Sequence, residues 1–146
     1  MMETKSRYET DYYSWTQEQA ALLKSGQLQN LDMLHLIEEV EDMASNKRSA
    51  LKSHLKVLLT HLLNWHYQPD RRGRSWTLTI TEQRLESNDI LEENPGLKPE
   101  LPGLIMKSYR LAKLQAERET GLDKNVFPEF CPWTFEQIIN DDFFPD

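Results

Sequence analysis

The chain has 146 residues, of which 38% are hydrophobic and 28% are charged, and its formal net charge is −7. The length predicts one domain, and the charge argues against a general nucleic-acid binder. The single cysteine, Cys131, excludes an internal disulfide and a cysteine-based zinc site, and we interpret it as a small apolar residue. Residues 1–10 lack the apolar core of a signal peptide, and no apolar run reaches the ~18 residues of a membrane span. We therefore expect a cytoplasmic protein without membrane contact.

Charge is distributed unevenly along the chain. Residues 1–46 carry a net −6, residues 47–84 a net +6 and residues 85–146 a net −7. The preferred interpretation is neutralisation between packed helices, because charge runs usually lie on solvated faces. The alternative is a site for an anion or a partner on the basic middle segment.

The first predicted helix spans about residues 17–25. Thr16 and Gln19 have the spacing of a capping box at its start, and Gly26 supplies the left-handed conformation that ends it. Three aromatic residues precede it at helical spacing and are expected to extend the same face: Tyr8, Tyr12 and Trp15.

A long helical pattern follows Asp32, which is the predicted N-cap. One helix from residue 33 to 67 would be about 50 Å long at ~1.5 Å per residue, which exceeds a compact domain of this size. We therefore expect a bend near Ser45–Lys47 and two helices over about 33–44 and 49–67. One continuous helix is the alternative.

The next break is residues 68–73, after which Ser75 is the predicted cap of a further helix. The run Trp-Thr-Leu-Thr-Ile-Thr has β-like residues, but we predict helix because no second strand exists to pair with it.

Two more helices complete the chain. One is predicted over about residues 101–119 and ends at Gly121. Thr134 and Gln137 form another capping box, which predicts a short helix ending near Asn140. Together the pattern predicts an all-α protein, a compact antiparallel bundle of five to six helices forming a single domain over residues 1–146.

Several short motifs occur in an order typical of one bacterial family. They are Asp11-Tyr12-Tyr13 with Trp15, Leu31-Asp32, Leu36-Ile37-Glu38-Glu39-Val40-Glu41, His61-Leu62-Leu63-Asn64-Trp65, Tyr67-Gln68-Pro69, Ser75-Trp76, Gln83-Arg84, Glu119-Thr120-Gly121-Leu122, Phe127-Pro128-Glu129, Cys131-Pro132-Trp133 and Asp141-Asp142-Phe143. Over nearly the whole chain they resemble the cyanobacterial domain-of-unknown-function family 29. The resemblance implies a small helical protein and no reaction, substrate or cofactor. Where this family usually has a basic residue, before the Trp of the His-Leu-Leu motif, this chain has Asn64.

Acidic residues and one histidine gather near the start of the long helical pattern. They are Asp32, His35, Glu38, Glu39, Glu41 and Asp42. A divalent cation would stabilise such closely spaced carboxylates, but no Glu-x-x-His pair and no His-Glu-x-x-His motif is present. We therefore expect a solvated acidic face in which Glu41 pairs with Arg48 or with a lysine of a neighbouring helix. A metal site is the alternative.

Three histidines follow in the basic middle segment, His54, His61 and His66. His54 and His61 lie two helical turns apart, too far to share one ion without a third element. We expect a core or boundary role with one hydrogen bond each. His61 is singled out because it lies near Trp65 and precedes the basic loop.

Four arginines and a tryptophan lie between residues 71 and 84: Arg71, Arg72, Arg74, Trp76 and Arg84. Arginines at a helix start add their charge to the exposed N–H groups there, a combination that attracts phosphate or carboxylate. The preferred alternative is a surface loop whose arginines meet acidic residues such as Glu38 or Glu92.

The leading hypothesis is a non-enzymatic protein-interaction or regulatory module, whose partner is another protein or a second copy of the chain. It rests on the missing catalytic signature, the segregated charge and the aromatic termini. The alternatives are a metal-dependent hydrolase or nuclease using residues 32–42, and binding of an anion or nucleic acid by residues 71–84. No cofactor is expected. The candidate surface comprises Glu38, Glu41, His61, Arg71, Arg72, Arg74, Trp76 and Arg84.

Overall fold

The computed structural model describes residues 7–146, and regular structure in this range consists of helices alone. The fold is 80% helical, without a strand in the described range. Its six α-helices are α1 (Arg7–Thr10), α2 (Tyr12–Lys24), α3 (Met33–Tyr67), α4 (Arg74–Glu93), α5 (Leu101–Thr120) and α6 (Phe135–Ile139). The all-α class and the number of helices are confirmed.

Contacts between residues divide the chain into two units. Unit 1 comprises residues 1–45 and unit 2 comprises residues 46–146. The prediction of a single domain stays a prediction. Each unit has its own packing and is described by itself.

In unit 1 the short α1 and the longer α2 precede the first turns of α3. Asp11 caps α2, because its side chain accepts a hydrogen bond from the Ser14 backbone N–H at 3.1 Å. The predicted cap at Thr16 is wrong. Thr16 lies inside α2, where its hydroxyl donates to the Tyr13 carbonyl at 2.6 Å, since the aromatic residues ahead of it extend the helix backwards. Gly26 follows α2 with a φ of 74°, as the sequence predicted.

The predicted bend at Ser45–Lys47 is wrong, because α3 runs unbroken from Met33 to Tyr67. The bend was expected so that one compact domain could contain the helix. The structure removes that requirement, since the two ends of α3 belong to different units. No Gly or Pro interrupts α3, and Ser45 and Asn46 are exposed, so neither forces a break.

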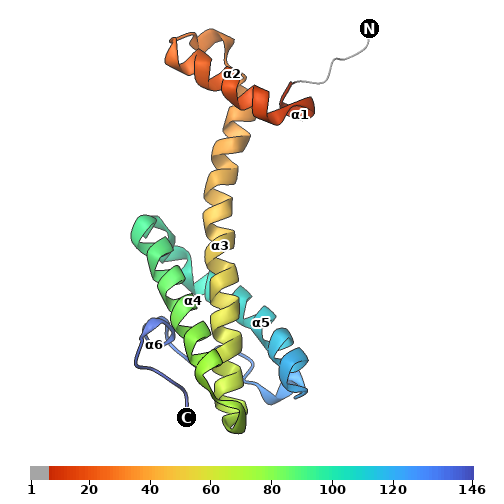
Figure 1. Ribbon diagram of the computed structural model, residues 1–146, viewed down its shortest axis with the longest axis vertical. Helices are drawn as coiled ribbons and strands as arrows, with labels where there is room; N and C mark the ends of the chain where they lie inside the picture. Colours follow the sequence, from red (N-terminus) through yellow and green to blue (C-terminus); the bar gives the residue numbers. More distant parts are fainter. Residues whose placement is uncertain (1–6) are drawn as a thin grey trace. The chain divides into compact units, whose positions relative to one another are not determined.

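The core of unit 2 forms around the later part of α3. Six of its leucines are fully buried: Leu51, Leu55, Leu58, Leu59, Leu62 and Leu63. Helix α4 runs back along this segment of α3, and α5 reverses direction again, so these three helices alternate in direction (Figure 1). One face of each of α4 and α5 joins the same cluster, through Ile80 and Leu91 of α4 and Leu101, Leu104, Ala112 and Ala116 of α5, together with Phe127 and Ile138 from the C-terminal part.

Helix α4 begins at Arg74, with Gly73 rather than the predicted Ser75 at the N-cap position. Ser75 lies within the first turn, where its carbonyl accepts from the Thr79 hydroxyl at 3.0 Å. Two neighbouring threonines, Thr77 and Thr81, bond the carbonyls four residues earlier in the same way. The threonine hydroxyls thus find acceptors within the helix, and the prediction of helix here is confirmed.

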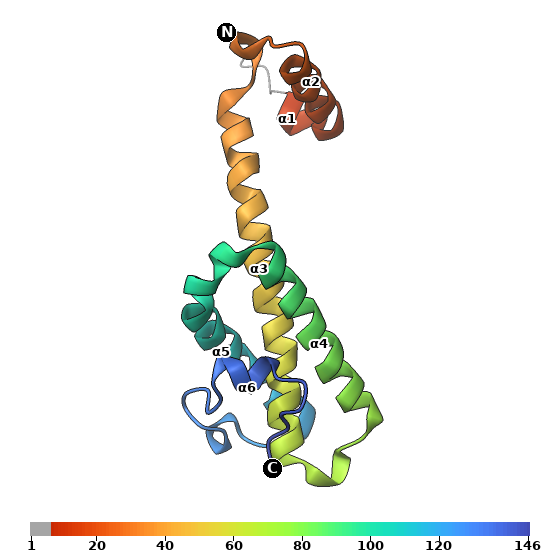
Figure 2. The same ribbon diagram turned by 90° about the vertical axis from the view of Figure 1, so that its left-hand side faces the viewer.

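The end of α5 and the start of α6 follow the sequence predictions. Gly121 ends α5 in the left-handed region with a φ of 78°. Thr134 and Gln137 form the predicted capping box of α6. Figure 2 shows α6 beside α4, so that the C-terminal segment returns to the helices formed earlier in the chain.

Within residues 7–146, no helix is long and apolar enough to span a membrane. Of the N-terminal stretch used to predict the absence of a signal peptide, residues 1–6 lie outside the described residues.

Candidate functional site

A polar and aromatic cluster connects the three helices of unit 1. Asp32 accepts hydrogen bonds from the Trp15 indole N–H at 3.0 Å and from the His35 ring nitrogen Nδ1 at 2.7 Å. The backbone N–H of Asp32 donates to the buried Gln19 side chain at 2.8 Å. Burial opposes ionisation of Asp32, but the bonds from His35 and Trp15 outweigh it, so the pKa of Asp32 lies below its ordinary value. Asp32 is therefore a structural carboxylate at the start of α3.

Glu39 receives both tyrosine hydroxyls of the N-terminal helices. Tyr12 and Tyr8 each donate to one oxygen of Glu39, at 2.6 Å in both cases. These bonds lower the pKa of Glu39, and the bond to Glu39 raises the pKa of Tyr8 to about 12. Carboxyl groups with lowered folded-state pKa values stabilise the fold above about pH 4, the ordinary value, and lose that contribution as the pH falls further.

We expect the tyrosine hydroxyls of the Glu39→Gln variant to ionise at lower pH than those of the wild type. Without the negative acceptor, the pKa of Tyr8 should fall from about 12 towards its unperturbed value of about 10. Tyrosinate absorbance measured against pH checks this, with far-ultraviolet circular dichroism confirming that helix persists over the range used. Glu41→Gln is the matched control, and titration curves that coincide for all three proteins would refute the assignment.

The predicted acidic cluster is divided between two faces of α3. Asp32, His35 and Glu39 bond within unit 1, whereas Glu38 and Glu41 are exposed. The predicted pairing of Glu41 with Arg48 is wrong, because Arg48 bonds Glu100 at 2.8 Å. Among residues 7–146, no group of three His, Cys, Asp or Glu side chains is placed to hold a metal ion.

An exposed apolar stripe lies on the same part of α3. Five large side chains are between 48% and 78% exposed: Met33, Leu34, Ile37, Val40 and Met43. We call these five residues the apolar stripe. Leu34 and Ile37 belong to the long helical pattern that follows Asp32, and their i, i+3 spacing is also that of a core helix. Spacing alone does not tell a core face from a docking face, and the stripe was missed for that reason.

Arg84 is a structural residue of unit 2 rather than part of a basic surface. Its side chain is 1% exposed. It donates to the carbonyls of Ile138 and Phe143, at 2.7 Å each, and to that of Asp141 at 3.4 Å. Burial lowers the pKa of Arg84, although nearby Asp141 opposes this effect. Arg84 thus fastens the C-terminal segment to α4.

The three remaining arginines of the basic segment differ in their contacts. Arg72 donates to the Trp65 carbonyl at 2.7 Å and lies 5.2 Å from the centre of the Trp65 ring. Arg71 approaches the Glu119 carbonyl at 3.5 Å, and Arg74 is exposed at the first position of α4. None of them pairs with Glu38 or Glu92 in the described structure.

The predicted histidine and tryptophan meet at the edge of unit 2. The rings of His61 and Trp76 lie edge to face, with centres 6.4 Å apart. Nδ1 of His61 donates to the Val57 carbonyl at 2.9 Å, and Nδ1 of His54 donates to the Gln83 side chain at 2.7 Å. His54 and His61 thus each make the single hydrogen bond expected of a boundary residue. For His66 the prediction is wrong, because its side chain is exposed and contacts the Tyr67 ring instead.

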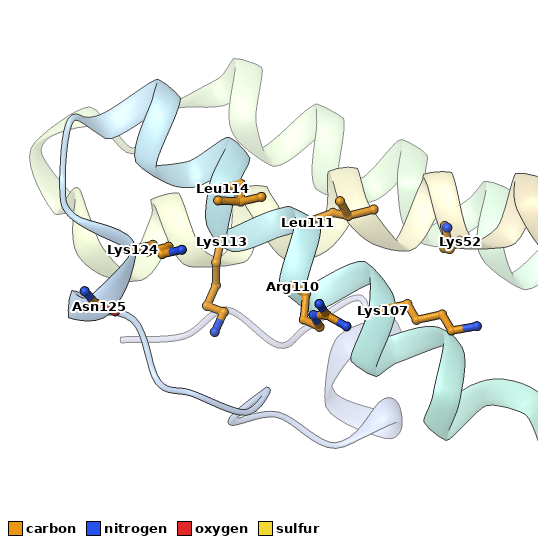
Figure 3. Close-up of a pocket in the computed structure, with 8 residues that line it drawn as sticks. All are labelled: Lys52, Lys107, Arg110, Leu111, Lys113, Leu114, Lys124 and Asn125. Atoms are coloured by element: carbon orange, nitrogen blue, oxygen red, sulfur yellow. The ribbon is translucent and has the colours of Figure 1, made fainter.

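A basic groove in unit 2 was not predicted. It has a volume of about 450 Å³. It is lined by Lys52, Lys107, Arg110, Leu111, Lys113, Leu114, Lys124 and Asn125, which Figure 3 shows as sticks. We call this set the basic groove. Its residues come from α3, α5 and the turn at Lys124–Val126. These residues are dispersed over the sequence within segments of mixed charge. No run of basic residues therefore predicts the groove.

The chain matches, over residues 7–144, the family described as "Domain of unknown function DUF29". It belongs to this family. The match extends over parts of both units. No curated protein and no solved structure matches the chain.

The motifs that carry the resemblance to the DUF29 family meet one another in space. Trp15 of one motif bonds Asp32 of the next, and Arg84 bonds the carbonyl of Phe143. The rings of Tyr67 and Phe127, from two further motifs, pack edge to face at 5.1 Å. In this DUF29 protein, these motif residues make contacts that hold the fold together.

Asn64 stands where the resemblance implies a basic residue. It is 2% exposed, and its amide N–H donates to the Glu119 carboxylate at 2.7 Å. Its side-chain oxygen is buried without a hydrogen-bond partner among the described residues. Asn64 therefore offers the Glu119 carboxylate a neutral donor.

Proposed function

We propose that this DUF29 protein is a non-enzymatic protein-interaction module whose docking surface is the apolar stripe of α3. The observation that carries the proposal is the exposure of five large apolar side chains on one part of one helix. Contiguous exposed apolar surface of this kind marks interaction sites, because water contact with it is unfavourable by roughly 25 cal/mol per Å².

The arrangement of the stripe supports a helical docking mode. Met33, Ile37 and Val40 recur at i, i+4 and i+7, the spacing with which amphipathic helices lie in apolar grooves. Glu38 and Glu41 border the stripe and are exposed. Acidic residues beside apolar anchors would select a partner surface that is both apolar and basic.

The two alternatives from sequence receive less support. The carboxylates of residues 32–42 lie on different faces of α3, and Glu39 and Asp32 are already hydrogen bonded. In the basic segment, Arg72 and Arg84 donate to carbonyls of the protein itself. Neither alternative is therefore favoured by a specific observation.

Two methionines of almost equal exposure allow a test. Met33, in the stripe, is 55% exposed, and Met106, on α5, is 53% exposed. Peroxide converts accessible methionine to its sulfoxide, which mass spectrometry detects. We expect a bound partner to slow the oxidation of Met33 relative to that of Met106. In the dilute, purified protein, the two methionines should be oxidised at similar rates.

A further inference from the structure

Two exposed helix faces of this chain have the same residue spacing and opposite charge. On α3, Leu34, Ile37, Glu38 and Glu41 lie at i, i+3, i+4 and i+7. On α5, Lys107, Arg110, Leu111 and Leu114 lie at i, i+3, i+4 and i+7 as well. We call the first set the acidic strip and the second the basic strip. In the acidic strip the apolar residues come first, whereas in the basic strip the charged residues come first.

Both strips are open to a partner. Leu34 and Ile37 are 78% and 48% exposed, and Leu111 and Leu114 are 39% and 47% exposed. The four charged residues, Glu38, Glu41, Lys107 and Arg110, are exposed too. Ion pairs among residues 7–146 involve other side chains, so the charges of the two strips are uncompensated within the described chain.

The basic strip is part of the basic groove, where further positive charge surrounds it. Lys52, Lys113 and Lys124 also line the groove, and no carboxylate does. Figure 3 shows the cationic side chains spread along α5 and its neighbours rather than converging on one point. This spread suits an extended acidic ligand better than a compact anion.

We propose that the acidic strip of one copy of this protein docks antiparallel on the basic strip of a second copy. In this register Glu41 faces Lys107, Glu38 faces Arg110, Ile37 faces Leu111 and Leu34 faces Leu114. The proposal rests on the interaction function proposed above and names both the partner and the surface that receives Leu34 and Ile37 of the apolar stripe.

Antiparallel pairing follows from the order of residues along each strip. Residues at i, i+3, i+4 and i+7 form one face of a helix. When one helix is reversed, the charged half of the acidic strip faces the charged half of the basic strip. The apolar halves of the two strips then face each other as well. A parallel pairing would place both glutamates over leucines and would leave both cations unpaired.

Charge and apolar surface together favour a second copy over a nucleic acid. Unit 1, which carries the acidic strip, has a net charge of −6. The groove contains two exposed leucines and no aromatic side chain on which a base would stack. Each copy carries one acidic and one basic strip, so this chain supplies both sides of the proposed contact.

Charge-swapped variants of the full chain test the proposal. Glu38→Lys/Glu41→Lys makes the acidic strip basic, and Lys107→Glu/Arg110→Glu makes the basic strip acidic. Each double variant alone brings like charges together wherever an acidic strip position meets a basic strip position of another copy. We expect the dissociation constant of each to rise about 100-fold over that of the wild type. Sedimentation equilibrium over a concentration series measures it.

An equimolar mixture of the two variants should associate again. The new lysines of one variant then face the new glutamates of the other, and the unchanged strips also remain complementary. Restoration to within about tenfold of the wild-type constant is expected, with weakening at high salt. Glu82→Lys/Glu86→Lys, at exposed positions of α4, is the control for Glu38→Lys/Glu41→Lys, with the same change in net charge, and should associate as the wild type does.

A wild-type protein that stays monomeric at the highest concentration tested would overturn the second-copy proposal. So would a mixture that fails to associate while both variants retain wild-type helicity. A monomer whose Met33 is still protected in lysate would leave the interaction function in place with a different partner. Unprotected Met33 in lysate would count against the interaction function itself, so the two failures are distinguishable.

Discussion

Replacing Arg84 with alanine is expected to destabilise unit 2 by about 3–5 kcal/mol. The change removes three hydrogen bonds from a charged donor to the carbonyls of Ile138, Asp141 and Phe143. Two of these carbonyls would lose a bond of 2.7 Å, and a cavity would remain where the largest fully buried side chain now lies. Denaturant unfolding followed by circular dichroism measures the loss.

Two variants separate this structural role from a role of positive charge. Arg84→Lys keeps the charge but lacks the planar donor group that reaches several carbonyls, so we expect it to lose much of the same stability. Arg74→Ala, at the exposed start of the same helix, should change stability by less than about 0.5 kcal/mol. Equal effects of Arg84→Ala and Arg74→Ala would show that Arg84 is not the fastening residue described here.

The same substitution at two leucines of α3 should have very different results. Leu62 is fully buried in the core of unit 2, and Leu62→Ala is expected to cost about 2–5 kcal/mol, because it leaves a cavity among packed side chains. Leu34 is 78% exposed, and Leu34→Ala should change the free energy of unfolding of the monomer by less than about 0.5 kcal/mol.

This pair of variants tests whether the first turns of α3 are core or surface. Unfolding is measured at a protein concentration low enough to keep the chain monomeric. A loss of more than about 2 kcal/mol in Leu34→Ala, a value typical of buried leucines, would mean that Leu34 packs inside the protein and that the stripe is not a docking surface.

The sequence predicted the helices well because their signals are local. Gly121 and the pair Thr134 and Gln137 end and begin helices through bonds within a few residues. The bend in α3 was predicted wrongly for a different reason. It was inferred from the assumed size of one compact domain, whereas the ends of α3 belong to two units.

The candidate residues were harder to interpret because exposure depends on the tertiary structure. Arg84 and Arg74 look alike in the sequence, but one is buried against carbonyls and the other is exposed. Glu38 and Glu39 are neighbours, yet only Glu39 receives the tyrosine hydroxyls. Periodicity indicated where helices form, and it did not indicate which faces stay open.

The basic groove shows the same limit at longer range. Lys52 and Lys107 are far apart in the sequence and line one groove only because α3 and α5 pack together. The net charge of −7 is a sum over the whole chain, so it does not indicate this local concentration of positive charge. The regular spacing of Lys107, Arg110, Leu111 and Leu114 can be read from the sequence. That these side chains form an open surface can be seen only in the structure, which shows them exposed.

The most direct measurement of the interaction function is the ratio of Met33 to Met106 oxidation in fresh native lysate. In the wild type this ratio should fall well below its value in dilute, purified protein. In the Ile37→Glu variant, which places a charge within the stripe, it should return to the purified value. A wild-type ratio in lysate equal to that of the purified protein would contradict the assignment of the stripe as a docking surface.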